Sequence, residues 1–398
     1  MLNLKIRHKR SLSLLALVLV AILVLASCTA AGARGIAQGW AGGVIADGTV
    51  FVGSMEGKVM ALDATDGTRR GQPIALLGQA ASGGFGCSAG GTSAVAIYSS
   101  PAFANGLLYV GGYDGKVNAF TFVDGQLRAE PRWIYPRSGS LSPIIGGLVA
   151  TGGKVYVTSG NGFVLALDAA DGFKEWVFDA GDKIWAAPAV EGGTVFVGSF
   201  DGKLYALDAD TGDLKWEFTT GGTIATTPAV AGGIVYVGSF DRHLYAVSAA
   251  TGELKWRFPA EGQDGPDGWF WAKPLVHNGI VYAPNLDGKV YAVDAFSGSS
   301  VRVYDLGLPI SSSPVAVGDS IIVASSVTNR SKRQGKIYSL TAGSNQPKLL
   351  QDISETIFAP LFASDTTVYV QTMANNLYAI DATSGASMKF SLSTESSQ

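Results

Sequence analysis

The amino-acid sequence predicts an all-β fold, an eight-bladed β-propeller of four-stranded antiparallel blades. One pattern recurs along the chain, most clearly as TVFVGSFDGKLYALDADTGDLKWEF from Thr194 and IVYVGSFDRHLYAVSAATGELKWRF from Ile234, which are offset by 40 residues. Six weaker copies begin at Thr49, Leu107, Lys154, Ile280, Ser320 and Thr367. Short segments of alternating polarity, separated by turn residues and without helical periodicity, favour a propeller over a sandwich.

Each copy divides into four strands. In six copies the first strand carries a proline, which suits an edge strand facing a central channel because proline cannot donate a ladder hydrogen bond. Pro101, Pro188, Pro228, Pro274 and Pro314 stand seven residues before the second strand, and Pro360 stands eight before it. The second and third strands alternate as in VFVGS and KLYALDA, and Asp-Gly pairs between them predict two-residue hairpin turns. A further turn, such as Asp210 to Gly212, leads to an outer strand that ends near Trp216. The Asp-Gly pairs are Asp114-Gly115, Asp201-Gly202 and Asp287-Gly288.

An aspartate recurs just before the turn between the third and fourth strands. A carboxylate at this position can accept backbone N–H groups of the turn, so we expect a structural role in every blade. The five copies are Asp63, Asp168, Asp208, Asp294 and Asp381.

The first 27 residues have the features of a secretory signal, with four basic residues before an apolar run from Leu12 to Ala26. The run is shorter than the roughly 20 residues that a spanning helix needs, although retention as a membrane anchor is the alternative. Leu25-Ala26-Ser27-Cys28 resembles the lipobox of bacterial lipoproteins, which implies lipidation of Cys28; the alternative is an ordinary signal with a chance cysteine. We therefore expect a signal peptide at 1–27, a lipid-anchored linker at 28–37 and one propeller at 38–398.

Composition limits the partners. Removal of residues 1–27 leaves 25 of the 29 basic residues against 32 acidic ones, a net charge of −7, which argues against nucleic acid. Lipidation of Cys28 would leave Cys87 without an intrachain partner, and only His243 and His277 remain as histidines after the signal. No disulfide framework or zinc site is expected, and we expect a monomeric propeller.

The segments ending in Trp176, Trp216 and Trp256 resemble the tryptophan-docking motif of PQQ-type (quinoprotein-repeat) propellers. The resemblance implies that each indole stacks on the neighbouring blade. Arg302 and Lys389 stand at or near this position in the sixth and eighth copies, and copies one, two and seven are irregular, so we expect other contacts there.

No catalytic residues and no cofactor are predicted. The quinoprotein dehydrogenases that share this repeat need an aspartate base and calcium ligands, and many add a vicinal disulfide, none of which can be assembled here. The chain also lacks a nucleophile elbow, a phosphate loop and a His-Glu-x-x-His motif. A PQQ-dependent oxidoreductase remains the alternative from another class.

Strand parity points to one face as the binding surface. In a four-stranded meander, the second-to-third turns and the connections between blades share a face, here called the loop-rich face. Four enlarged segments are expected there, at about Gly71–Ala96, Asp124–Leu141, Glu261–Trp271 and Val327–Lys336.

Two groups on this face are candidate partner contacts. Trp269, Phe270 and Trp271 form an aromatic group, and Arg330, Lys332 and Arg333 belong to the densest basic cluster. The alternatives are that the aromatics pack into the channel mouth or under a blade, and that the basic group is a solvated hairpin tip.

Together these features resemble the BamB-type outer-membrane assembly lipoproteins. The resemblance implies a non-enzymatic scaffold of the cell envelope, tethered to a membrane through Cys28 and engaging an envelope or membrane protein. The membrane would be the outer one if the cell has one. A small-ligand or polysaccharide binder that uses the channel mouth is a further alternative.

Overall fold

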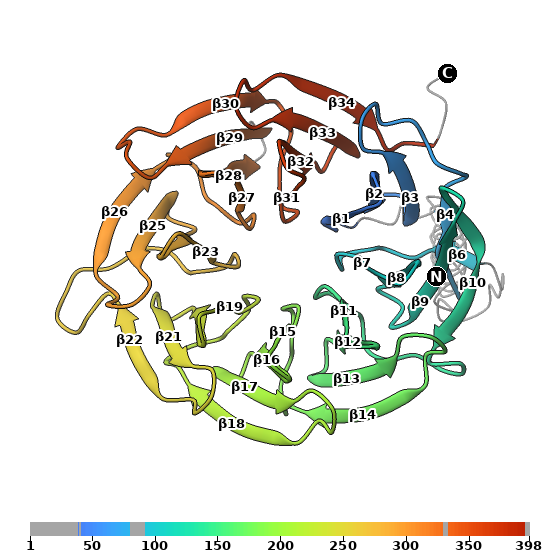
Figure 1. The fold of residues 1–398 in the computed structure, drawn as a ribbon, viewed down its shortest axis with the longest axis horizontal. Coiled ribbons are helices and arrows are strands. Elements are labelled where there is room, and N and C mark those ends of the chain that lie inside the picture. Colours follow the sequence, from blue (N-terminus) through green and yellow to red (C-terminus); the bar gives the residue numbers. More distant parts are fainter. Residues whose placement is uncertain (1–38, 40, 80–91, 329–332, 395–398) are drawn as a thin grey trace, which may run out of the picture. The chain divides into compact units, whose positions relative to one another are not determined.

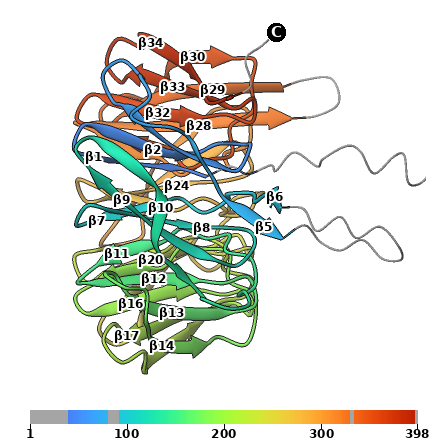
Figure 2. The same ribbon diagram turned by 90° about the vertical axis from the view of Figure 1, so that its right-hand side faces the viewer.

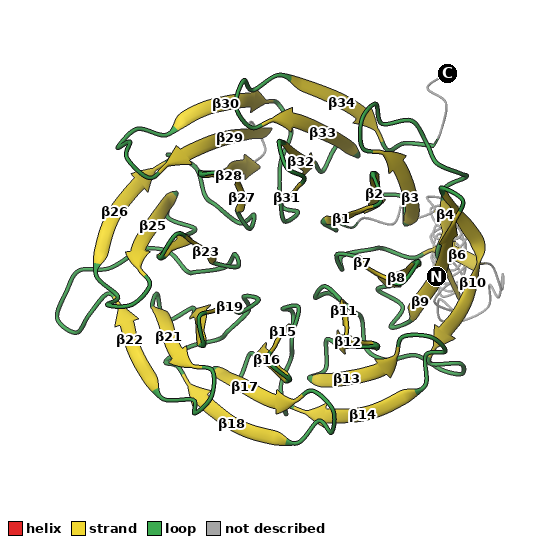
Figure 3. Ribbon diagram, in the orientation of Figure 1, coloured by secondary structure: helices red, strands yellow, loops and turns green. Residues whose placement is uncertain are grey.

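A computed structural model describes residues 39, 41–79, 92–328 and 333–394. The described residues belong to one compact unit, Ala37–Gln398. Eight four-stranded antiparallel sheets form a ring of blades, and no helix occurs in the described part of the chain (Figures 1 and 3). The predicted eight-bladed all-β propeller is therefore confirmed.

The strands of each blade follow one another outward from the ring centre (Figure 1). The first strands are β1 (Gly43–Ala46), β7 (Ala102–Ala104), β11 (Val149–Thr151), β15 (Ala189–Glu191), β19 (Ala229–Ala231), β23 (Leu275–His277), β27 (Val315–Val317) and β31 (Phe362–Ala363). The second strands are β2 (Thr49–Gly53), β8 (Leu107–Gly111), β12 (Lys154–Thr158), β16 (Thr194–Gly198), β20 (Ile234–Gly238), β24 (Ile280–Pro284), β28 (Ser320–Thr328) and β32 (Thr367–Gln371).

The outer half of each blade is more variable in length. The third strands are β3 (Lys58–Asp63), β9 (Val117–Val123), β13 (Phe163–Asp168), β17 (Lys203–Asp208), β21 (Leu244–Ser248), β25 (Lys289–Asp294), β29 (Arg333–Thr341) and β33 (Asn376–Asp381). The fourth strands are β4 (Ile74–Ala75), β10 (Gln126–Tyr135), β14 (Lys174–Asp179), β18 (Leu214–Thr219), β22 (Leu254–Phe258), β26 (Ser300–Asp305), β30 (Lys348–Ile353) and β34 (Ser387–Ser391). An additional two-stranded sheet is formed by β5 (Leu77–Gln79) and β6 (Thr92–Ala94).

Burial explains the sequence of each strand. All five residues of β16 are buried, because a second strand lies in the middle of a sheet that is covered on both sides by neighbouring blades. The outermost strand β18 has no fully buried residue and carries Lys215 and Glu217. Continuous apolar runs therefore belong to the inner strands, and charged residues are tolerated only at the rim.

The three Asp-Gly turns between second and third strands are one residue longer than predicted. In blade 4, the Ser199 N–H donates to the Lys203 carbonyl and the Gly202 N–H donates to the Ser199 carbonyl, which encloses Phe200, Asp201 and Gly202. Gly202 has a φ of 83°, so the left-handed residue sits at the end of a three-residue loop. The requirement for glycine was predicted correctly, but the two-residue turn type was wrong.

Blades dock through the predicted tryptophans. The indole N–H groups of Trp176, Trp216 and Trp256 donate to the carbonyls of Ala209, Ala249 and Ala295 in the third-to-fourth turn of the next blade, each at 3.0 Å. A glycine of left-handed φ follows in each receiving turn, and a Cβ on Gly212 would lie 2.6 Å from the Trp176 ring. These contacts fix each blade against the next.

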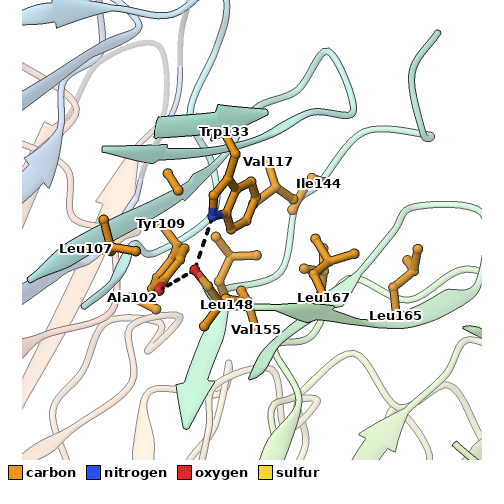
Figure 4. Packing of buried hydrophobic residues seen from close by; sticks show 13 residues of the cluster. Ala102, Leu107, Tyr109, Val117, Trp133, Ile144, Leu148, Val155, Leu165 and Leu167 are labelled. Atoms are coloured by element: carbon orange, nitrogen blue, oxygen red, sulfur yellow. Dashed lines mark hydrogen bonds between the residues drawn. The ribbon is translucent and has the colours of Figure 1, made fainter. Parts of the chain in front are cut away.

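Blade 2 uses the same device, which the sequence analysis missed. Trp133 donates to the Ala169 carbonyl at 3.1 Å, and the Tyr109 hydroxyl donates to the same oxygen at 3.0 Å (Figure 4). Trp133 pairs with Ala119, as Trp176 pairs with Ala166. The expectation of a different contact at blade 2 was therefore wrong.

Blades 6 and 8 dock without tryptophan, as predicted. Arg302 of blade 6 donates to the Ser344 carbonyl of blade 7 at 2.6 Å. Between blades 8 and 1, a Cβ on Gly67 would lie 2.3 Å from Phe390, and the Tyr369 hydroxyl donates to the Ala64 carbonyl at 2.9 Å. Blades 1 and 8 each consist of four consecutive strands, so the ring closes through contacts of this kind and not through a shared strand.

The repeated aspartates have the predicted structural role. The carboxylates of Asp63, Asp168, Asp208, Asp294 and Asp381 each accept a backbone N–H two residues later, at 2.7–3.1 Å. A hydrogen bond from Lys215 and the turn N–H groups lower the pKa of Asp208 to about 2. The pKa of Asp63 is likewise lowered to about 2, chiefly by a hydrogen bond from Arg70.

Candidate binding face

The loop-rich face carries the irregular segments of the ring. The β5–β6 sheet and the far end of the long β28–β29 hairpin extend on the same side (Figure 2). One enlarged segment was assigned wrongly: 124–141 is not a crossover, because it contains the Asp124-Gly125 turn and the ten-residue strand β10. Only the stretch from 136 to 148 connects blades 2 and 3.

The connections that enter blades 2 to 8 alternate between buried and more exposed positions. Four residues before the proline position, a large apolar side chain is 0–1% exposed and wedges between blades. The next residue is partly exposed, the one after it is buried, and the one before the proline is again partly exposed in most blades. The wedge residues are Ile97, Ile144, Ile184, Ile224, Phe270, Ile310 and Ile357.

Phe270 is therefore a core residue and not a surface contact. Phe270 is 1% exposed and stands at the position that isoleucine occupies in other blades. Gly238 leaves space for the larger ring, because a Cβ on Gly238 would lie 2.3 Å from the Phe270 Cβ. The prediction of Phe270 as a partner contact is wrong for this physical reason. Its two neighbours in sequence point the other way.

Trp269 and Trp271 form a surface cluster with Phe240, which comes from the second-to-third turn of blade 5. The Phe240 ring lies 4.7 Å from Trp269 at an interplanar angle of 11°, and 5.7 Å from Trp271 at 23°. Trp269 is 47% exposed. Stacking fixes these rings before any partner arrives, which reduces the entropy lost on binding. We call Phe240, Trp269 and Trp271 the aromatic cluster.

Similar aromatic pairs occur at two other blades. Trp185 lies 4.7 Å from Phe200, and Tyr98 lies 5.3 Å from Tyr113, measured between ring centroids. Trp185 and Tyr113 are 37% and 48% exposed. Of these three aromatic groups, formed by described residues, the aromatic cluster is the largest.

Blade 5 departs from its repeat beside the aromatic cluster. Arg242 has a φ of 71° at the position where Gly202 and Gly288 have 83° and 89°, so an exposed arginine occupies a conformation that favours glycine. His243 follows, and its ring nitrogen lies 3.4 Å from Asp241. Backbone strain of this kind is often kept at functional sites.

A hollow of about 640 Å³ opens next to this turn, and its mixed lining includes Asp241, His243, Arg257, Phe218 and Leu254. The Asp241 carboxylate accepts the Tyr245 hydroxyl at 2.6 Å and the Gly221 N–H at 2.7 Å. Burial, followed by this hydrogen bond, raises the pKa of Tyr245. Since corresponding Tyr–Asp bonds occur in blades 4 and 6, the pair itself is structural.

The predicted basic group is divided between described and undescribed residues. Arg333 is exposed at the start of β29, and Lys336 lies 4.0 Å from Asp352. Arg330 and Lys332 lie outside the described residues, as do Cys28 and Cys87. The structure brings no described residue of this hairpin to the aromatic cluster.

The described residues contain no group of three or more His, Cys, Asp or Glu side chains that could hold a metal ion. Within the same ranges, no helix is long and apolar enough to cross a membrane.

The family model described as outer membrane protein assembly factor BamB matches residues 26–177 and 160–389, which together span most of the sequence. The chain belongs to the BamB family. A comparison with curated protein sequences found no match.

Solved structures share the propeller fold with this BamB-family chain. BamB from Moraxella catarrhalis is 19% identical with a TM-score of 0.63, over 90% of this chain and 96% of that one. The computationally designed Ika8 protein is 16% identical with a TM-score of 0.63, over 89% and 96%. A quinohemoprotein alcohol dehydrogenase from Pseudomonas putida HK5 is 18% identical with a TM-score of 0.58, over 74% and 66%. At these identities the likeness concerns the fold.

Proposed function

We propose that this BamB-family chain is a non-enzymatic scaffold lipoprotein of the cell envelope that binds a protein partner through its loop-rich face. The observation that carries the proposal is the aromatic cluster, whose rings are stacked, partly exposed and built on irregular segments of a rigid ring. Rigid, exposed tryptophans are typical anchors of protein interfaces. Family membership supports a role in outer-membrane protein assembly.

Membrane attachment through Cys28 is part of the proposal. About ten residues separate Cys28 from Ala37, where the compact unit begins, and an extended chain of this length reaches roughly 30–35 Å. The ring would then work close to the membrane, within reach of an embedded partner. Cys28→Ser should move the protein from the membrane fraction to the soluble fraction, and unchanged fractionation would contradict lipidation.

Site-specific photocrosslinking in intact cells tests the binding face. A photoreactive phenylalanine analogue in place of Trp269 should capture a discrete envelope protein. The matched control replaces Phe296, an aromatic residue that is 89% exposed in a third-to-fourth turn on the opposite face. Capture from position 296 but not from 269 would place the interface on the face of the third-to-fourth turns and would contradict the proposal.

Substitution of the aromatic cluster completes the test. With the photoreactive analogue placed at Phe240 instead, Trp269→Ala combined with Trp271→Ala should abolish capture. The unfolding transition of the double variant should change little, because both side chains lie at the surface. Stoichiometric uptake of PQQ and calcium, followed by dye reduction, would instead support the oxidoreductase alternative that the quinohemoprotein neighbour keeps open.

A further inference from the structure

One position of the repeat forms a closed circle around the ring centre. It lies two residues before the first strand in blades 2 to 8 and one residue before β1, which begins one repeat position earlier. The position is occupied by Gly42, Ser100, Gly147, Ala187, Thr227, Lys273, Ser313 and Pro360. A Cβ on Gly42 would lie 2.7 Å from the Ser100 Oγ and 3.5 Å from the Pro360 Cβ, so members from adjacent blades touch. We call these eight residues the axial ring.

Hydrogen bonds between blades hold the axial ring. The N–H groups of Gly42, Ala187 and Lys273 donate to the hydroxyl oxygens of Ser100, Thr227 and Ser313, at 3.1–3.2 Å. Each hydroxyl accepts in this arrangement, so its own hydrogen remains available for donation. Among the described residues, no acceptor takes these three hydrogens. The ring therefore presents hydroxyl donors with unused capacity.

Lys273 is the one charged member of the axial ring. Its flanking members, Thr227 and Ser313, are two of the three hydroxyl residues. The Lys273 side chain is exposed to solvent, yet desolvation by the surrounding protein lowers its pKa. No ion pair of Lys273 occurs within the described ranges. Lys273 is thus a partly desolvated cation without a counter-ion, and such a cation favours binding of an anion.

Trp271 stands two residues before Lys273 in the segment that enters blade 6. Phe270 and Ala272 are 1% and 4% exposed, whereas Trp271 and Lys273 are not buried. The chain bends at Ala272, between the two side chains. Trp271 is also stacked on Phe240, which connects the axial ring to the aromatic cluster.

We propose that the axial ring binds a carboxylate, with the Lys273 ammonium as counter-ion and the hydroxyls of Thr227 and Ser313 as further donors. One cation within an otherwise neutral ring matches a single negative charge, whereas a phosphate dianion would need more positive charge. The inference goes beyond the proposed function, because it needs neither the lipid anchor nor a protein partner. The carboxylate can belong to a small molecule or to a peptide.

Titration of the full-length protein with paired probes tests the site. The probes are a tripeptide ending in phenylalanine as the free acid, the same tripeptide as its amide, and phenylacetate as a small carboxylate. Protein with ¹³C-labelled lysines reports binding at each lysine by NMR, and Lys273→Gln identifies the resonance of Lys273. The acids should shift this resonance, and the amide should not.

Substitutions separate the site from nonspecific attraction. Lys273→Gln should weaken binding of the acids about tenfold or more, as expected for loss of a charged hydrogen-bond partner, and Lys273→Arg should retain most of it. The control Lys255→Gln removes a lysine from the outer strand β22 and should have no effect. Tighter binding of the peptide acid than of phenylacetate identifies a protein segment as the source, and equal binding identifies a small molecule.

Two results would overturn the site. One is that no carboxylate shifts the Lys273 resonance while the amine is protonated, and the other is that Lys273→Gln binds the acids as well as the wild-type protein. Because these measurements use purified protein, they stand apart from photocrosslinking: loss of capture at Trp269 leaves carboxylate binding intact, and the reverse also holds.

Discussion

The two faces of the ring are built from the same repeat, but the contacts on one face are the same in several blades, whereas the side chains on the other face vary from blade to blade. On the face of the third-to-fourth turns, the carbonyls of Ala169, Ala209, Ala249 and Ala295 receive the docking tryptophans in the same way. On the loop-rich face, corresponding positions hold different side chains, among them Gly160, Phe200, Phe240 and Leu286. The uniform face holds the blades together, and the variable face is free to carry recognition.

Loss of a docking tryptophan should reduce the free energy of unfolding more than any other substitution on the two faces. Trp176→Ala removes a side chain that is 7% exposed and opens a cavity between blades 3 and 4, so we expect a loss of about 3–5 kcal/mol in the free energy of unfolding. Trp269→Ala on the loop-rich face should cost less than about 1 kcal/mol, since it removes mainly one ring stack. Urea unfolding followed by circular dichroism measures both, and similar losses would contradict the division of roles.

The glycine beneath a docking indole should be nearly as sensitive. Gly212→Ala places a Cβ against Trp176 at a φ of 77°, and we expect a loss of about 2–4 kcal/mol from strain and overpacking together. Gly232→Ala is the matched control, because its φ is 59° but nothing lies within 4 Å of the added Cβ. It should cost only about 1–2 kcal/mol. Equal losses in urea unfolding would show that contact with the indole contributes nothing.

One substitution on the loop-rich face should stabilise the protein, in contrast to the losses expected on the opposite face. Arg242→Gly relieves the left-handed strain and should raise the free energy of unfolding by up to about 1 kcal/mol. Thermal unfolding monitored by calorimetry measures this gain. Destabilisation would mean that the arginine side chain makes a contact that outweighs the strain.

The smallest expected effect is on the free energy of unfolding at acidic pH. The folded pKa of Asp208 is about 2, below the ordinary value of about 3.9, so its contribution to stability is complete above about pH 4 and is lost as the pH falls toward 2. Asp208→Asn should reduce the pH dependence of the urea midpoint between pH 4 and 2. An unchanged slope would show that this exposed carboxylate does not couple protonation to folding.

The fold could be predicted from the sequence because its units repeat, and errors arose where an insertion or a substitution hid the repeat. In blade 2, Trp133 stands eight positions after Gly125, whereas Trp216 stands four positions after Gly212, so the docking tryptophan lay outside its expected spacing. The same insertion made β10 resemble a crossover. Phe270 could have been assigned correctly, because Ile97, Ile184, Ile224 and Ile310 stand at the same distance before a proline.

The candidate site was less predictable than the fold. Proximity of Phe240 to Trp269 and Trp271 depends on how blade 5 packs against the connection into blade 6, and pairing patterns within one blade do not contain that information. The axial ring likewise exists only after closure, since its members come from eight blades. In the sequence, nothing distinguishes Lys273 from any other lysine that precedes a proline.

Because no blade borrows a strand from elsewhere in the chain, each sheet can be completed as soon as its own residues are free to fold. Sheets can then add one after another, and the final event is the meeting of Phe390 and Tyr369 with the turn around Ala64 and Gly67. The same arrangement makes the molecule tolerant of circular permutation: new termini cut between two blades, with the old ones joined, would leave every sheet whole.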